Sequence, residues 1–155
     1  MKLFLLRHAE AEDSAPDALR PLTKYGRRSV IDLASFLKDR IRLDYDEIWH
    51  SPLIRAVETA NLFRESTGLK AAILERTGLY PMDDPEAIIG QIDAQEKSIL
   101  LVAHNPHFEA LTATLLGLDP YRTPVNVPKA SLLRFRRYGQ HWQLRDLLTT
   151  KVTGR

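Results

Sequence analysis

The stretch LFLLRH, residues 3–8, is the part of the sequence that decides the fold. Its four apolar residues show no alternation with polar ones, which is typical of a central strand covered on both faces in a parallel sheet. The run ILLVAH, residues 99–104, has the same character. We therefore expect two central strands of one sheet, each followed by a histidine, at His8 and His104.

Amphipathic helices are expected between these two strands. Apolar residues recur at helical spacing from Val30 to Ile41 and from Leu53 to Phe63. Three positions share a helix-start pattern in which a capping side chain precedes a proline. These positions are Ser51-Pro52, Asp84-Pro85 and Asn105-Pro106, and Gly68 and Gly117 stand where two of the helices should end.

The remaining elements complete an α/β chain. Shorter strands are expected at Glu47 to Trp49 and Ala71 to Leu74, and a C-terminal hairpin at Ser131 to Arg136 and Trp142 to Leu147. The segment from Pro120 to Pro128 holds three prolines and is expected to be a surface connection. The pattern predicts a three-layer sandwich with a mostly parallel central sheet, helices on both faces and a C-terminal hairpin. We expect residues 1–155 to form a single domain.

Composition excludes several classes of function. The 22 Lys and Arg against 20 Asp and Glu leave a formal charge of +2, so no nucleic-acid partner is expected. The arginines of residues 134–137 fit a half-solvated edge strand better than an RNA site. The absence of cysteine excludes disulfides and thiolate nucleophiles. The apolar run at residues 3–6 is too short for an export signal or a membrane span, so a cytoplasmic protein without a membrane partner is expected.

Three segments should meet at one edge of the sheet, because ligands of open parallel sheets bind beyond the carboxyl ends of the strands. They are Arg7-His8, the stretch from Ser51 to Arg55, and His104-Asn105-Pro106. They contribute two arginines and two histidines, and the nearest carboxylate is Glu10. Guanidinium groups match phosphate oxygens, and a neutral imidazole is a competent nucleophile toward phosphorus. The pattern therefore predicts a phosphoryl site with His8 as the nucleophile.

These motifs also carry a family resemblance. Arg7-His8-Ala9, the stretch SPLIRAVETA at residues 51–60, and VAHNP at residues 102–106 resemble the three signatures of the histidine phosphatase superfamily, also called the phosphoglycerate mutase-like family. The compact length and the run RPLTKYGR at residues 20–27 are similar to SixA-type phosphohistidine phosphatases. The resemblance implies a hydrolase that removes phosphoryl groups through a phosphohistidine enzyme intermediate.

Carried over by position, the resemblance implies that His8 is phosphorylated while Arg7 and Arg55 clamp phosphoryl oxygens. It implies that His104 donates a hydrogen bond to the phosphoryl group in the transition state. Ser51 and Glu10 are further candidate substrate-binding residues, because they lie next to the same motifs. We expect no metal or other cofactor, since the guanidinium groups can neutralise the charge.

One departure from the family pattern bears on the substrate. Mutases and many phosphomonoesterases of the family place a glutamate acid after the third strand, where this chain reads Leu79-Tyr80-Pro81. An alkoxide leaving group needs such an acid, whereas the imidazole of phosphohistidine can be protonated by solvent. Asp83, Asp84 or Glu10 remain possible acids. The favoured substrate is thus phosphohistidine in a phosphotransfer protein; the alternatives are a small phosphorylated metabolite and, less favoured, a non-catalytic phosphate-binding module.

Other histidines allow a metal site to be considered. His104 and His107 have His-x-x-His spacing, and His50 and Glu10 could lie nearby. We expect no metal, because arginines beside the site would repel a cation. His107 is expected to be exposed in the first turn of a helix, and His50 to be a strand-end histidine beside the pocket.

Overall fold

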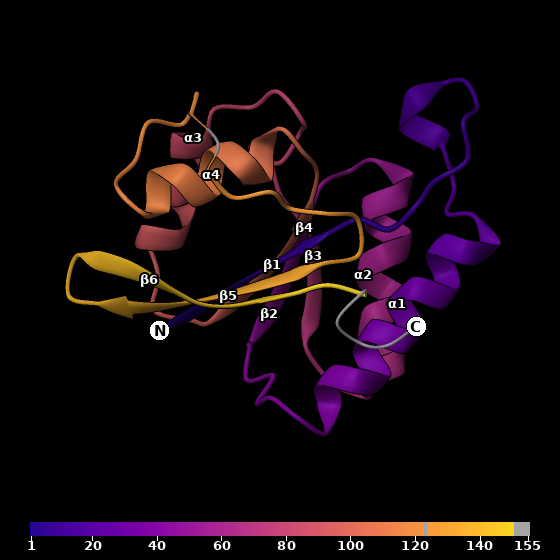
Figure 1. Ribbon diagram of the computed structural model, residues 1–155, viewed down its shortest axis with the longest axis horizontal. Coiled ribbons are helices and arrows are strands. Elements are labelled where there is room, and N and C mark those ends of the chain that lie inside the picture. Colours follow the sequence, from indigo (N-terminus) through magenta and orange to yellow (C-terminus); the bar gives the residue numbers. More distant parts are fainter. Residues whose placement is uncertain (123, 151–155) are drawn as a thin grey trace.

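A six-stranded sheet forms the centre of the molecule. The computed structural model describes residues 1–122 and 124–150, with the strands in the order β3-β2-β4-β1-β5-β6 (Figure 1). The strands are β1 (Lys2–Arg7), β2 (Glu47–His50), β3 (Ala72–Glu75), β4 (Ile99–Ala103), β5 (Leu132–Tyr138) and β6 (His141–Leu148). The first four run parallel to one another, and β5 and β6 are antiparallel additions at one edge. The predicted mostly parallel sheet with a C-terminal hairpin is confirmed.

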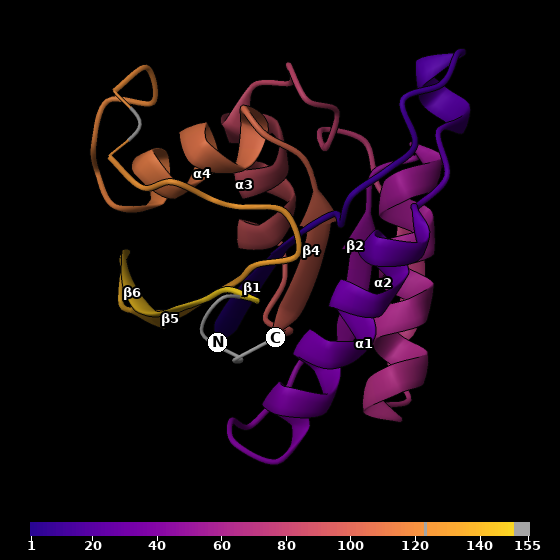
Figure 2. The same cartoon turned by 45° about the vertical axis from the view of Figure 1, so that its right-hand side comes forward.

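Helices cover both faces of the sheet and make three layers. Figures 1 and 2 show α1 (Lys24–Lys38) and α2 (Ile54–Thr67) on one face, and α3 (Pro85–Asp93) and α4 (His107–Leu115) on the other. A short helix, η1 (Asp17–Leu19), precedes α1. Successive residues of β1 point to opposite layers: Phe4 packs with the α1 and α2 side, and Leu5 with the α3 and α4 side. Each such buried side chain contributes about 1.5–3 kcal/mol, which explains why the strands show no polar alternation.

The predicted helix boundaries are partly right. Asp84 caps α3 by accepting a hydrogen bond from the Glu86 N–H at 2.9 Å, with Pro85 as the first helical residue. Gly68 ends α2 in the left-handed conformation, at φ 72°. The strands at the expected positions differ from their predicted limits by one or two residues.

The predicted starts at Ser51-Pro52 and Asn105-Pro106 are wrong. Helix α2 begins at Ile54 and α4 begins at His107, and neither has a side-chain cap. The side chains that should cap them are used elsewhere, as described below for the site.

The sequence predicts a surface connection from Pro120 to Pro128, and this is only partly right, because Val127 is fully buried. The described residues between Pro120 and Pro128 form neither helix nor strand, and Thr123 lies outside the described residues. Within the part of the chain that the structure describes, none of the helices is long and apolar enough to span a bilayer.

Candidate functional site

The carboxyl edge of the sheet brings the predicted segments together. Backbone hydrogen bonds continue one residue past the strands, from the His8 N–H to the Ala103 carbonyl at 3.0 Å and from the Ser51 N–H to the Val102 carbonyl at 3.1 Å. The residue after each strand therefore has a fixed backbone. The rings of His8 and His104 lie 5.0 Å apart between their centroids.

His8 is buried, and a single hydrogen bond defines its tautomer. Its Nδ1 lies 2.7 Å from the carbonyl oxygen of Ala9. A carbonyl oxygen only accepts, so Nδ1 must carry the proton and donate it. In the neutral ring, Nε2 then has a free lone pair.

Burial lowers the pKa of His8 from 6.5 to about 3. The Ala9 carbonyl opposes this shift, and the positive charges of Arg55, Arg7 and Lys129 add to it. His8 is therefore neutral at physiological pH. A neutral imidazole surrounded by cations is suited to attack an electron-poor centre that bears negative charge.

Arg7 and Arg55 reach the site from opposite sides. The Nη1 of Arg7 donates to the Val127 carbonyl at 2.8 Å, while its Nε is buried and has no hydrogen-bond partner among the described residues. Arg55 is the second residue of α2 and is 5% exposed. A cation at that position opposes the helix dipole, so its retention there indicates an anionic partner.

That partner is in part Asp17 of η1, which the sequence analysis did not identify. The Nη1 of Arg55 donates to the Asp17 carbonyl at 3.0 Å, and the two side chains form an ion pair at 3.4 Å. The Asp17 side chain is 64% exposed, so solvent screens this pair and its contribution is small. No sequence signal distinguishes Asp17 from the other loop carboxylates.

His104 is the second buried histidine of the edge. Its Nε2 lies 2.7 Å from the Ser51 hydroxyl, and its Nδ1 is buried without a partner among the described residues. Burial lowers its pKa to about 2, with further lowering by His8 and Arg55. His104 is therefore also neutral, and its free nitrogen is Nδ1.

Ser51 lies beneath His104. It is fully buried, and its oxygen accepts a hydrogen bond from the Leu53 N–H at 3.3 Å. Its hydroxyl proton is then available for Nε2 of His104. Engagement with His104 explains why Ser51 does not cap a helix that starts at Pro52.

The Asn105 side chain also forms hydrogen bonds within the site. Its amide donates to the Glu109 carboxylate at 2.9 Å and to the Val127 carbonyl at 3.0 Å, the same carbonyl that Arg7 contacts. Asn105 therefore fixes the segment that holds Arg7, and its side chain is not a helix cap.

The other predicted residues have mixed outcomes. The Glu10 carboxylate accepts a hydrogen bond from the Thr23 hydroxyl at 2.9 Å, so its proposed contact with substrate stays a prediction. His50 is buried at the end of β2, where its Nδ1 donates to the Ser51 carbonyl at 2.8 Å. The prediction that His107 is exposed is wrong: it is 1% exposed, because loop 81–85 and residues 120–121 enclose it.

The backbone beside His8 depends on contacts that sequence reasoning missed. The Ala9 N–H donates to the Thr59 hydroxyl at 3.2 Å, and Thr59 in turn donates to the Arg55 carbonyl at 2.7 Å. Helix α2 therefore supplies both a cation and a backbone anchor to the segment that holds His8. At Gly26, a Cβ would stand 2.1 Å from the Glu10 carbonyl oxygen, so only glycine permits α1 to approach this segment.

Lys129 was also missed. It precedes Ala130, whose φ of 51° is unusual for a residue with a side chain. The Ala130 N–H donates to the carbonyls of Arg7 at 3.2 Å and His8 at 3.3 Å, which ties this bend to the end of β1. The positive φ itself could not be read from the sequence.

A carboxylate also stands at the end of the third strand. Glu75 is the last residue of β3, pairs in register with His50 and is exposed. It lies before residues 79–81, where the family pattern places an acid. The strand-end rule that identified His8 and His104 applies equally to Glu75.

The chain was compared with known proteins. A model of the histidine phosphatase superfamily (branch 1) matches residues 3–78. The structure of the protein histidine phosphatase SixA complexed with tungstate has a TM-score of 0.87 and 22% identity, covering 98% of this chain and 99% of that chain. No curated protein matches the sequence.

Two further solved structures are similar over nearly their whole length. A protein from Agrobacterium tumefaciens assigned to phosphohistidine phosphatase SixA has a TM-score of 0.81 and 28% identity, covering 96% of this chain and 97% of that chain. The alpha-ribazole phosphatase from Shigella flexneri has a TM-score of 0.81 and 19% identity, covering 97% of each chain.

Proposed function

We propose that this chain, whose residues 3–78 match the model of the histidine phosphatase superfamily, removes phosphoryl groups through a covalent intermediate on His8, and that its substrate is phosphohistidine in a signalling protein. The observation that carries this proposal is the tautomer of His8. Donation from Nδ1 to Ala9 leaves Nε2 as the nucleophilic nitrogen. The proposal includes a reaction without a metal, because Arg7 and Arg55 can neutralise the phosphoryl charge.

The first step is attack of the Nε2 lone pair of His8 on phosphorus. A P–N bond forms to His8 as the bond to the substrate imidazole breaks, and that imidazole keeps the electron pair and takes a proton from water. In the second step, water attacks the phosphoenzyme, which releases phosphate and regenerates neutral His8. Both steps pass through a phosphoryl group with charge on its three equatorial oxygens.

Buried donors without partners support binding of those oxygens. Arg7 Nε and His104 Nδ1 are buried and lack hydrogen-bond partners among the described residues. Leaving such groups unpaired costs about 1–3 kcal/mol each, so a ligand that accepts from them is favoured. For His104 to donate from Nδ1, its Nε2 must accept from the Ser51 hydroxyl, which the 2.7 Å separation allows.

The carboxylates first considered as acids support phosphohistidine as the substrate. The Asp83 carboxylate accepts from the Tyr80 N–H at 2.9 Å, and the Asp84 carboxylate caps α3. The Glu10 carboxylate accepts from Thr23. Each thus uses one carboxylate oxygen as an acceptor that holds a loop. A substrate whose leaving group takes its proton from water suits such a site.

The second candidate substrate is a small phosphorylated metabolite. Glu75 favours it, because an exposed carboxylate at the same sheet edge could protonate an alkoxide leaving group. Glu75→Gln should then reduce hydrolysis of a phosphomonoester and leave phosphohistidine hydrolysis unchanged.

The direct test is turnover of a phosphohistidine protein and of a simple phosphomonoester, both measured in EDTA. Faster hydrolysis of the phosphohistidine protein is expected. Preference for the monoester would reverse the substrate assignment, and strict metal dependence would contradict the mechanism. Turnover of neither would leave only a phosphate-binding module.

A further inference from the structure

A second cavity lies next to the catalytic edge, over the start of α4. It has a volume of about 440 Å³ and is lined by residues 81–85, the first turn of α4 and residues 120–121. Pro106, in its wall, follows the His104-Asn105 segment of the site directly. The cavity therefore adjoins the His104 segment of the site.

The rim of the cavity exposes large apolar side chains. Met82 is 83% exposed and Tyr121 is 93% exposed, and both line the cavity. Single exposed apolar residues are common, but two that flank one cavity form a contact surface. The tyrosine ring also offers a face on which a cation can stack.

The same rim is acidic. Asp83 and Asp84 line the cavity, and each uses one oxygen to hold its own loop. Among residues 1–122 and 124–150, no Lys, Arg or His forms an ion pair with either carboxylate. Two carboxylates without counter-charges beside apolar surface match an incoming cation.

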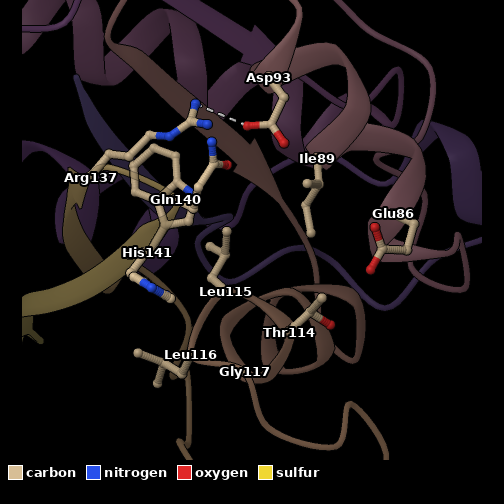
Figure 3. A pocket seen from close by; sticks show the side chains of 11 residues that line it. Glu86, Ile89, Asp93, Thr114, Leu115, Leu116, Gly117, Arg137, Gln140 and His141 are labelled. Atoms are coloured by element: carbon tan, nitrogen blue, oxygen red, sulfur yellow. Dashed lines mark ion pairs between the residues drawn. The ribbon is translucent and has the colours of Figure 1, made fainter.

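The cavity shown in Figure 3 lacks this feature. It lies between α3, α4 and the hairpin, and its Arg137 and Asp93 pair with each other at 3.1 Å. Arg137 also lies 5.7 Å from the centroid of the Trp142 ring. In the cavity of Figure 3 the arginine is thus already paired with a carboxylate of the wall, whereas Asp83 and Asp84 have no such partner among the described residues.

His107 adds an independent observation. It lines the acidic cavity, is 1% exposed, and neither ring nitrogen makes a hydrogen bond within ordinary limits among the described residues. A neutral imidazole has one N–H donor and one acceptor nitrogen. The acceptor nitrogen of His107 can therefore take a hydrogen bond from an N–H of the ligand.

We propose that this cavity binds an arginine or lysine side chain that lies near the phosphohistidine in the substrate protein. The proposal rests on the function proposed above, and it deepens that function by adding a cationic residue to the substrate. The ammonium or guanidinium group pairs with Asp83 and Asp84 and donates to His107, while its aliphatic stem lies between Met82 and Tyr121. The substrate would therefore present a negative group to the arginines and a positive group to the carboxylates.

The test uses phosphohistidine peptides that carry one arginine, placed in turn at each flanking position, and matched peptides with glutamine instead. For each enzyme variant, the measured quantity is the ratio of kcat/KM for the arginine peptide to that for the glutamine peptide. The wild-type ratio should reach about tenfold at the best position, which corresponds to one desolvated ion pair. Because the ratio is taken within one variant, a general loss of activity cancels.

The double variant Asp83→Asn/Asp84→Asn should bring this ratio close to one, since asparagine keeps the loop hydrogen bonds and the helix cap. The double variant Glu65→Gln/Glu96→Gln removes two exposed carboxylates from other loops and helices, and should keep the wild-type ratio. Arginine peptides should also shift the His107 imidazole signals in the NMR spectrum.

Two outcomes would overturn the docking proposal. One is a wild-type ratio of one at every arginine position, and the other is an undiminished ratio in Asp83→Asn/Asp84→Asn. Failure of the proposed function is distinguishable, because wild-type enzyme would then hydrolyse neither peptide nor phosphoramidate, the small P–N compound used as the control substrate.

Discussion

The ends of β1 and β4 are built alike but present opposite chemistry. Both strands contain a buried apolar run, and a buried histidine directly follows each strand. Both histidines are neutral because burial lowers their pKa values, to about 3 for His8 and about 2 for His104. His8 uses Nδ1 to donate to a carbonyl, which leaves a lone pair at Nε2. His104 uses Nε2 toward a hydroxyl, which leaves Nδ1 to donate. The hydrogen-bond partner of each ring therefore determines whether its free nitrogen offers a lone pair or an N–H.

Replacing the nucleophile gives the largest expected effect. His8→Ala should lower kcat about 10⁴-fold or more and should remove the phosphoenzyme, because no other lone pair occupies that position. Steady-state rates measure kcat, and incorporation of acid-labile phosphate measures the phosphoenzyme. His141→Ala, which changes an exposed histidine of β6, is the matched control. Near-normal turnover in His8→Ala would show that His8 is not the nucleophile.

Replacing the donor should have a smaller effect. His104→Ala should lower kcat about 10²–10³-fold, the usual loss for one transition-state donor. The phosphoenzyme should still form, only more slowly, because Nε2 of His8 is intact. Rapid-quench measurement of phosphoenzyme formation tests this difference. Complete loss of phosphoenzyme in His104→Ala would mean that His104 and His8 share one role.

The lowered pKa of His8 also makes the free energy of unfolding depend on pH. The folded-state pKa of about 3 lies below the unfolded value of 6.5. The stabilisation is therefore complete above pH 6.5 and is lost progressively as the pH falls toward 3. From pH 7 to pH 5, His8 should account for a loss of about 2 kcal/mol in the free energy of unfolding.

Urea unfolding of wild type and His8→Asn at pH 7 and pH 5 measures this contribution. The acid-induced loss should be about 2 kcal/mol smaller in the variant. Equal losses in both proteins would mean that His8 is not held neutral by the fold.

Removing the support of His104 should have the smallest effect. Ser51→Ala should lower kcat about tenfold with little change in KM, because the hydroxyl acts through the His104 tautomer and not on the phosphoryl group directly. The control is Ser29→Ala, which removes a buried hydroxyl that is not part of the site and donates to the Tyr25 carbonyl. A rise in KM with unchanged kcat would instead make Ser51 a direct ligand of the substrate.

The sequence predicts the fold well because its strongest signals are local. The apolar runs at residues 3–6 and 99–103 indicate buried strands, because they show no alternation with polar residues. Helices between the two runs indicate crossover connections, which make the strands parallel, as β1 and β4 are. The sequence also predicts that Arg55 lies in the first turn of α2. A cation is unfavourable there because of the helix dipole, so this position marks Arg55 as a candidate functional residue.

The helix starts show where local reasoning fails. Ser51, Asp84 and Asn105 share the same local pattern, but only Asp84 caps a helix. Ser51 is engaged by His104 and Asn105 by Val127, both of them tertiary partners, and Asn105 also donates to Glu109 of the following helix. A residue that belongs to a site is withdrawn from the local role that its sequence predicts.

The parts of the site that lie on loops could not be predicted. Asp17 reaches Arg55 from a position 38 residues away in the chain, and Lys129 depends on the positive φ of Ala130. The burial of His107 follows from two loops that close over α4. None of these contacts produces a periodic signal in the sequence.

The nitrogen of His8 that carries the phosphoryl group tests the account most directly. Wild-type enzyme would be quenched during turnover of a phosphohistidine substrate, and the position of the phosphoryl group on His8 determined by NMR of the isolated peptide. Phosphorylation at Nε2 is predicted, because Nδ1 is held by the Ala9 carbonyl at 2.7 Å. Phosphorylation at Nδ1, or turnover without any phosphorylated His8, would contradict the account.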